Sequence, residues 1–206
     1  SSLEADLIAS EALAAERQQN LENNRALLND FNLVNLDLSD YNLSGGDLSN
    51  ADLSGADLSG ADLSGADLSG VDLSDTDLSG ADLSGTNLSG STVTDSQLQS
   101  ALSVTGVILK DHDMSYWNLL GIDLSGADLT GSGMWEADLS GADLSGADLS
   151  YTSPTRTDLS NADLSGSVSS WAGMADADLS GADLSGADWY YVHIEGANLS
   201  LSLIHI

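Results

Sequence analysis

The sequence ADLSG occurs four times without interruption between Ala51 and Gly70, and close variants of it continue on both sides. A period of five matches neither the helical period of 3.6 residues nor the strand period of two, so no ordinary amphipathic helix or strand explains the pattern. A short repeat that is sustained over many copies predicts a solenoid, in which each copy buries its apolar side against the neighbouring copies.

Each copy has two apolar and three polar positions. We call the leucine the centre of the copy; in the first half of the chain, centres recur at every fifth residue from Leu33 to Leu98. A small or apolar residue such as Ala51 or Val71 stands two positions before most centres. The remaining positions hold Asp or Asn, then Ser, then mostly Gly. This distribution predicts a narrow, continuous interior with polar groups facing water.

The pattern closely resembles that of the pentapeptide-repeat family, whose signature is A(D/N)LXX in tandem, over most of residues 31–206. The resemblance implies an all-β fold, a right-handed quadrilateral parallel β-helix in which four copies form one square coil. In that geometry the centre and the residue two before it point inward, and residues one coil apart, such as Asp52 and Asp72, stack. Repulsion between stacked carboxylates predicts that salt or mild acid stabilises the rod.

Residues 1–30 differ in composition from the repeats and predict an N-terminal α-helix. Ser1 and Glu4 have the spacing of a capping box, and an apolar stripe follows. Such a helix either caps the open end of the β-helix, whose strand groups would otherwise be unpaired, or forms a dimer through its heptad-like leucines.

The repeats are predicted to form two blocks, residues 31–98 and residues 107–206, separated by a short helical interruption at residues 99–106. Thr94 and Gln97 again have capping-box spacing, and the helical segment is expected to extend to about Ala101. The centres move by one position after this break. Together the blocks predict about eight coils and a rod of about 40 Å.

Composition excludes several classes of function. The net charge is −29, and Lys110 and Arg156 are the only bases after residue 30. Direct nucleic-acid binding needs clustered bases and is not expected, whereas a basic protein partner is compatible with this charge. The chain has no cysteine for disulfide or thiolate chemistry. It has no apolar run of the roughly 18 residues that a membrane span needs, so we expect a soluble, cytoplasmic protein without a membrane anchor.

No catalytic motif is present. His112, His193 and His205 are the only histidines, and no metalloprotease, nucleophile-elbow or phosphate-loop sequence occurs. Columns of carboxylates could hold Ca²⁺, but nothing resembles a calcium-binding loop, and a solvated acidic face is the simpler interpretation. We therefore expect no enzymatic activity, cofactor or metal.

The departures from the repeat cluster on two adjacent sides of the second block. One side has the centres Met114, Met134, Pro154, Met174 and Ile194, and none of these copies matches the consensus. The outward positions of the two sides contain the candidate partner-binding residues Tyr116, Trp135, Tyr151, Arg156, Trp171, Tyr190 and Tyr191. Tyr151, Trp171 and Tyr191 are spaced one coil apart and are expected to stack, while Trp117 and Trp189 occupy inward positions and are expected in the core.

Exposed Trp and Tyr beside an Arg have the composition of a binding hot spot. The sequence therefore predicts a non-catalytic structural and protein-interaction scaffold that makes its contacts through this divergent aromatic surface. A purely structural aromatic ladder, and a carbohydrate-binding or enzymatic use of the same rings, are alternatives. The family resemblance implies another alternative, an acidic rod that mimics DNA and binds a type II topoisomerase such as gyrase. A homodimer could form through an end of the β-helix or the N-terminal helix.

Overall fold

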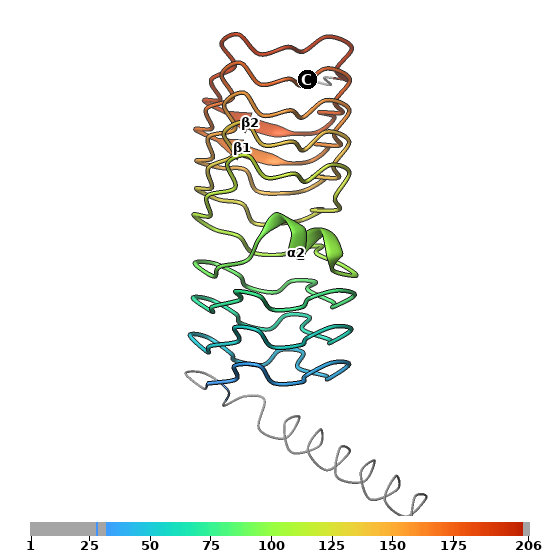
Figure 1. Cartoon of the computed structure of the whole chain (residues 1–206). Helices are drawn as coiled ribbons and strands as arrows, with labels where there is room; N and C mark the ends of the chain where they lie inside the picture. Colours follow the sequence, from blue (N-terminus) through green and yellow to red (C-terminus); the bar gives the residue numbers. More distant parts are fainter. Residues whose placement is uncertain (1–27, 29–31, 204–206) are drawn as a thin grey trace, which may run out of the picture.

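A computed structural model describes Leu28 and residues 32–203 as a rod of stacked, four-sided coils (Figure 1). The helix predicted for residues 1–30 lies outside the described residues, except for Leu28, which is buried in the hydrophobic core.

Four pentapeptides form each coil, as the resemblance to the pentapeptide-repeat family implies. Parallel bridges join residues 20 positions apart and form one column on each of the four sides; in the first block the columns begin with Asn32↔Asp52, Asp37↔Asp57, Asn42↔Asp62 and Asp47↔Asp67. The predicted stacking of Asp52 on Asp72 is confirmed. Each coil therefore acts as a set of four very short strands that pair with the coils on either side.

The core is the continuous column of inward side chains. Leu53, Leu58 and Leu63 are fully buried, and the alanines two positions before the centres, such as Ala56, are almost as inaccessible. The ladder satisfies the backbone beside them: the Leu53 amide donates to the Asp72 carbonyl at 3.1 Å, and the Asp57 amide donates to the Leu36 carbonyl at 2.8 Å.

The polar positions form the corners of the coil. The Asp52 carboxylate accepts hydrogen bonds from the amide of Ser54 at 3.0 Å and from its hydroxyl at 2.6 Å, which is an Asx-type turn. The next residue, Gly55, has a φ of 68°, a left-handed conformation that glycine adopts without steric cost. The Asp, Ser and Gly of the consensus are thus a corner-forming unit.

One side of one coil is replaced by helix α2, Asp95–Ser100. Thr94 is its N-cap, and the capping box with Gln97 is confirmed. The helix begins before the interruption predicted at residues 99–106 because Leu98, only 2% exposed, is the core side chain of this side and belongs to the helix itself.

The register then shifts by one residue. Ser103 pairs with Asp82 and Ile108 pairs with Asn87, which are 21 positions apart rather than 20. The extra residue moves every later centre by one position.

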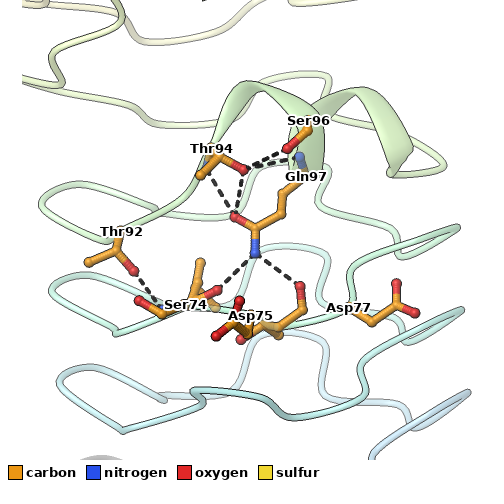
Figure 2. Close-up of a pocket in the computed structure, with 9 residues that line it drawn as sticks. Ser74, Asp75, Asp77, Thr92, Thr94, Ser96 and Gln97 are labelled. Carbon is orange, nitrogen blue, oxygen red and sulfur yellow. Dashed lines mark hydrogen bonds between the residues drawn. The ribbon is translucent and has the colours of Figure 1, made fainter.

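The side chain of Gln97 also forms hydrogen bonds where α2 interrupts the backbone ladder. Its Nε2 donates to the carbonyls of Leu73 at 2.8 Å and Thr76 at 3.0 Å, across a shallow pocket that Ser74, Asp75 and Thr92 help to line (Figure 2). These carbonyls belong to the coil below, where the Thr76 carbonyl would otherwise pair with a strand amide. The Leu73 carbonyl also accepts from the Thr76 amide at 3.1 Å, so it is the Thr76 carbonyl that Gln97 keeps from being unpaired.

The described residues contain two strands longer than a single bridge, β1 (Val168–Ser170) and β2 (Asp188–Tyr190). They pair in parallel, with Val168 opposite Asp188 and Ser170 opposite Tyr190. Both strands extend two residues beyond the single bridge position of the usual side and end immediately before Trp171 and Tyr191. They lie on neighbouring coils (Figure 1).

Candidate interaction surface

The corners of the second block differ from those of the first in their side chains, although not in their backbone. Tyr116, Tyr151, Trp171 and Tyr191 have φ angles of 64°, 61°, 61° and 55° and occupy the left-handed position that is glycine in the consensus copies. Bulky residues are uncommon in this region because the Cβ atom crowds the following carbonyl, at a cost of roughly 1–2 kcal/mol per residue. The fold therefore presents these rings outward in spite of a local conformational cost.

Four of the rings lie along one corner of the rod, which we call the first aromatic edge: Tyr151, Trp171, Tyr190 and Tyr191. Trp171 stacks on Tyr191 with ring centroids 4.5 Å apart and planes at 21°, and Tyr190 meets Tyr191 edge-on at 4.2 Å. All four side chains are more than half exposed.

The predicted stack is thus only partly formed. Tyr151 is held one coil from Trp171, since its amide donates to the Ser170 carbonyl at 2.8 Å. No ring of the described part of the chain contacts the Tyr151 ring, which is 62% exposed.

The other candidate residues lie along the neighbouring corner, which we call the second aromatic edge: Tyr116, Trp135, Glu136 and Arg156. Tyr116 and Trp135 contact edge-to-face at 4.9 Å. Arg156 forms an ion pair with Glu136 at 3.3 Å, and both side chains are exposed. The structure therefore divides the seven predicted residues between two edges.

A side without carboxylates in its middle coils separates the two edges. Its outward column is Asp113, Gly133, Ser153, Gly173 and His193, whereas the next side along the chain has aspartates at Asp138, Asp158 and Asp178. We call Gly133, Ser153 and Gly173 the uncharged strip. Open space surrounds the position that a Cβ of Gly173 would occupy, so the missing carboxylate is not a steric requirement. This strip was not predicted from the sequence, although Asp is missing from this column on four consecutive coils, from Gly133 to His193.

Pro154 interrupts the ladder beneath the strip. Its ring nitrogen has no hydrogen to donate to the Gly173 carbonyl, and Ser153 and Gly173 do not form a bridge. The hydroxyl of Thr155 donates to that carbonyl instead, at 3.1 Å. At this point the Thr155 side chain supplies the hydrogen bond between the two coils that the backbone of Pro154 cannot form.

The predicted core tryptophans lie where the sequence places them. Trp117 and Trp189 are partly buried and pack against the core, and the indole nitrogen of Trp189 donates to the hydroxyl of Ser167 at 3.2 Å. His112 stands two positions before the centre Met114, an inward position; it is buried, and its ring lies edge-to-face with that of Trp117, with centroids 5.7 Å apart. Its Nδ1 has no hydrogen-bond partner, and burial lowers its pKa.

The surface carries a large excess of negative charge. Lys110 forms an ion pair with Asp128 at 2.8 Å, and that hydrogen bond raises the pKa of Lys110. Since Arg156 is paired as well, both bases that follow residue 30 are neutralised. Within residues 32–203, no group of three His, Asp or Glu side chains is arranged to hold a metal ion. No helix in the described part of the chain has the length and hydrophobicity that crossing a bilayer requires.

Comparison with known proteins agrees with this architecture. The family model for pentapeptide repeats matches residues 24–60, 32–70, 56–95, 113–146, 137–168 and 177–202. No curated protein matches the chain. Among solved structures, HetL, a pentapeptide repeat protein involved in heterocyst differentiation regulation from the cyanobacterium Nostoc sp. strain PCC 7120, is 32% identical. The alignment covers 84% of this chain and 78% of HetL, with a TM-score of 0.65.

Two further solved structures are more distant. A pentapeptide repeat protein of the Arabidopsis thaliana thylakoid lumen is 26% identical, over 62% of this chain and 71% of that one, with a TM-score of 0.32. QnrB1, a plasmid-mediated fluoroquinolone resistance protein, is 23% identical, over 84% of this chain and 81% of that one, with a TM-score of 0.34. The likeness to HetL implies that the β-helix is right-handed.

Proposed function

Because the chain belongs to the pentapeptide-repeat family, we propose that it is a non-catalytic scaffold that binds a protein partner through the two aromatic edges of its second block. Between the end coils its backbone groups pair in the ladder, and its interior is filled mainly with Leu and Ala, so recognition along the sides of the rod depends on the outward side chains.

The observation that supports this proposal most strongly is the position of Tyr151. The residue adopts a φ of 61° where glycine would be unstrained, yet its ring gains no aromatic contact in return. A purely structural ladder would offset the backbone cost with stacking of about 0.5–1.5 kcal/mol per ring pair. A ring that is strained, exposed and unstacked has the properties of a binding anchor.

Binding can be tested with a purified wild-type protein and a variant in which Tyr151, Trp171 and Tyr191 are replaced by glycine, the consensus residue. Proteins captured by the wild type from the source organism would be identified by mass spectrometry, and each candidate would be re-measured as a purified protein by calorimetry. We expect a loss of affinity of at least tenfold in the triple variant, as for central aromatic anchors. Leu201→Gly is the matched control, since Leu201 is a 93% exposed residue with a φ of 62° on a different corner. Equal affinity of the triple variant and the control would refute the proposal.

A second function, mimicry of DNA toward a type II topoisomerase, is favoured by the stacked aspartates. The columns of the other sides, such as Asp138, Asp158 and Asp178, repeat a negative charge along the rod about every 4.8 Å. A gyrase supercoiling assay tests this function directly. Inhibition that persists when the aromatic edges are removed would support mimicry by the acidic columns, and unchanged supercoiling at a large molar excess of the protein would exclude it.

A further inference from the structure

This inference rests on the proposed function and extends it. We propose that the first aromatic edge binds an arginine-containing segment of the partner, with a guanidinium group stacked on the open face of Trp171. Four observations lead to this proposal: one open ring face, a local gap in the acidic columns, carboxylates on the adjoining coils, and the neutralisation of the nearby bases.

The open face follows from the ring geometry. Tyr191 covers one face of Trp171 at 4.5 Å, and no ring of the described residues covers the other. Tyr151 occupies the equivalent corner position on the coil before that of Trp171, and its own ring is unstacked and exposed. Two aromatic residues one coil apart, with no ring contact between them, can receive a planar cation by stacking.

Carboxylates lie on the coils before and after that of Trp171, but none lies beside the ring on its own coil. On the coil of Trp171 the outward residues on either side of the corner are Val168 and Gly173, so the ring lies in a neutral gap. Asp148 and Asp188 occupy the same column as Val168 on the coils below and above. A cation on the ring would therefore have one carboxylate in this column on the coil below and one on the coil above, and neither is in an ion pair with Lys110 or Arg156.

Charge also decides between possible partners. A second copy of this chain, with a net charge of −29, would be repelled, and so would a nucleic acid. Lys110 and Arg156 cannot fill the site themselves, because each is paired with a carboxylate elsewhere. Arginine is favoured over lysine because its flat, weakly hydrated guanidinium stacks on rings, whereas the ammonium group is a compact, strongly hydrated charge. The uncharged strip beside the edge leaves room for the partner's backbone.

The ratio of two affinities tests the proposal. Labelled oligo-arginine and oligo-lysine peptides of equal length would be titrated with the protein at about 0.15 M salt, where attraction to distant charges is screened. An acidic rod attracts both peptides, but ring stacking favours arginine. We expect the wild type to bind oligo-arginine roughly threefold to tenfold more tightly than oligo-lysine, and we expect this preference to disappear in the Tyr151→Gly, Trp171→Gly double variant.

The controls separate stacking from charge and from folding. Leu201→Gly should keep the preference, and Trp171→Leu should lose it while retaining a bulky apolar side chain. Because the preference is first measured on the wild type, a variant that fails to fold does not leave the proposal untested. Equal affinities for the two peptides, a preference that survives in the double variant, or tighter binding of a neutral oligosaccharide would each overturn it. A different result would refute this inference alone: the edge variants lose binding to the purified partner, but the wild type shows no preference for oligo-arginine. The proposed function would then remain intact.

Discussion

The indole ring of Trp171 stacks on the phenol ring of Tyr191 at 4.5 Å, although 20 residues separate them in the sequence. The pairing of β1 with β2 sets this distance, because Ser170 and Tyr190 lie opposite each other immediately before the two rings. The β-helix thus converts a repeat of five residues into a column of side chains along one corner.

Replacing Trp171 and Tyr191 by glycine should leave the free energy of unfolding within about 1 kcal/mol of wild type. Two ring contacts are lost, Trp171–Tyr191 and Tyr190–Tyr191, each worth about 0.5–1.5 kcal/mol, and relief of two left-handed residues at roughly 1–2 kcal/mol each offsets this loss. Thermal and urea unfolding would measure the change. Leu179→Ala, which empties a fully buried position, serves as the contrast and should cost about 2–5 kcal/mol. If the two variants lose stability equally, the edge is a structural element.

Gln97→Ala should destabilise the rod by about 2–3 kcal/mol, because it removes half of the capping box of α2 and leaves the Thr76 carbonyl without its donor, while the Leu73 carbonyl keeps the Thr76 amide. Urea unfolding monitored by circular dichroism would measure it. Gln99→Ala is the matched control on the same helix, since its contacts with the carbonyls of Asn118 and Leu120 are longer, at 3.4 and 3.3 Å. A smaller effect at Gln97 than at Gln99 would contradict the role assigned to the Gln97 amide.

Thr155→Val should cost about 1–3 kcal/mol, since the Gly173 carbonyl then has no donor opposite Pro154. Valine preserves the shape of the side chain, so the loss reports the hydrogen bond. The double variant with Pro154→Leu supplies the expected rescue, because a backbone amide becomes available at that position. Failure of the second change to recover any stability would argue against this explanation.

Acid should destabilise the rod below about pH 4, the ordinary range of an aspartate. The hydroxyls and amides of Ser39 and Ser49 donate to Asp37 and Asp47 and hold the pKa of both carboxyls below the ordinary value. A carboxyl with a lowered folded-state pKa contributes stability above its unfolded-state pKa, and that contribution is lost as the pH falls through the folded-state value. These hydrogen bonds reverse the expectation from the sequence that mild acid stabilises the rod. An NMR titration of the carboxyl carbons would measure the lowered pKa values of Asp37 and Asp47. Values above the ordinary range would indicate instead that repulsion between the carboxylates dominates.

His112 should make stability depend on pH in a second range. Burial lowers its pKa and Asp113 opposes the shift, so the unfolded chain takes up a proton at a higher pH than the folded chain does. The free energy of unfolding should therefore decrease as the pH falls below about 6.5. Urea titrations at several pH values between 7.5 and 5 would measure the slope. His112→Ala, which restores the consensus residue, should flatten this slope, and a slope that persists in the variant would contradict the role assigned to His112.

Much of this molecule follows from the sequence because the repeat itself specifies the packing. A Leu and an Ala at fixed positions in every copy can be buried together only when the copies stack, and Asp-x-Ser followed by Gly, as in Asp52 to Gly55, forms a corner from local hydrogen bonds. The capping box at Thr94 and Gln97 is equally local, so α2 was also predictable, although its range was not.

Contacts between coils were decided by the tertiary structure alone. The sequence placed Tyr151, Trp171 and Tyr191 at equivalent positions, but ring orientation depends on the exact path of each corner, and only the last two rings stack. The same holds for the Gln97 amide, which reaches carbonyls more than 20 residues away, and for the Thr155 hydroxyl beneath Pro154. Periodicity determines which residues share a column, whereas which atoms touch within it depends on displacements of an ångström that no repeat pattern encodes.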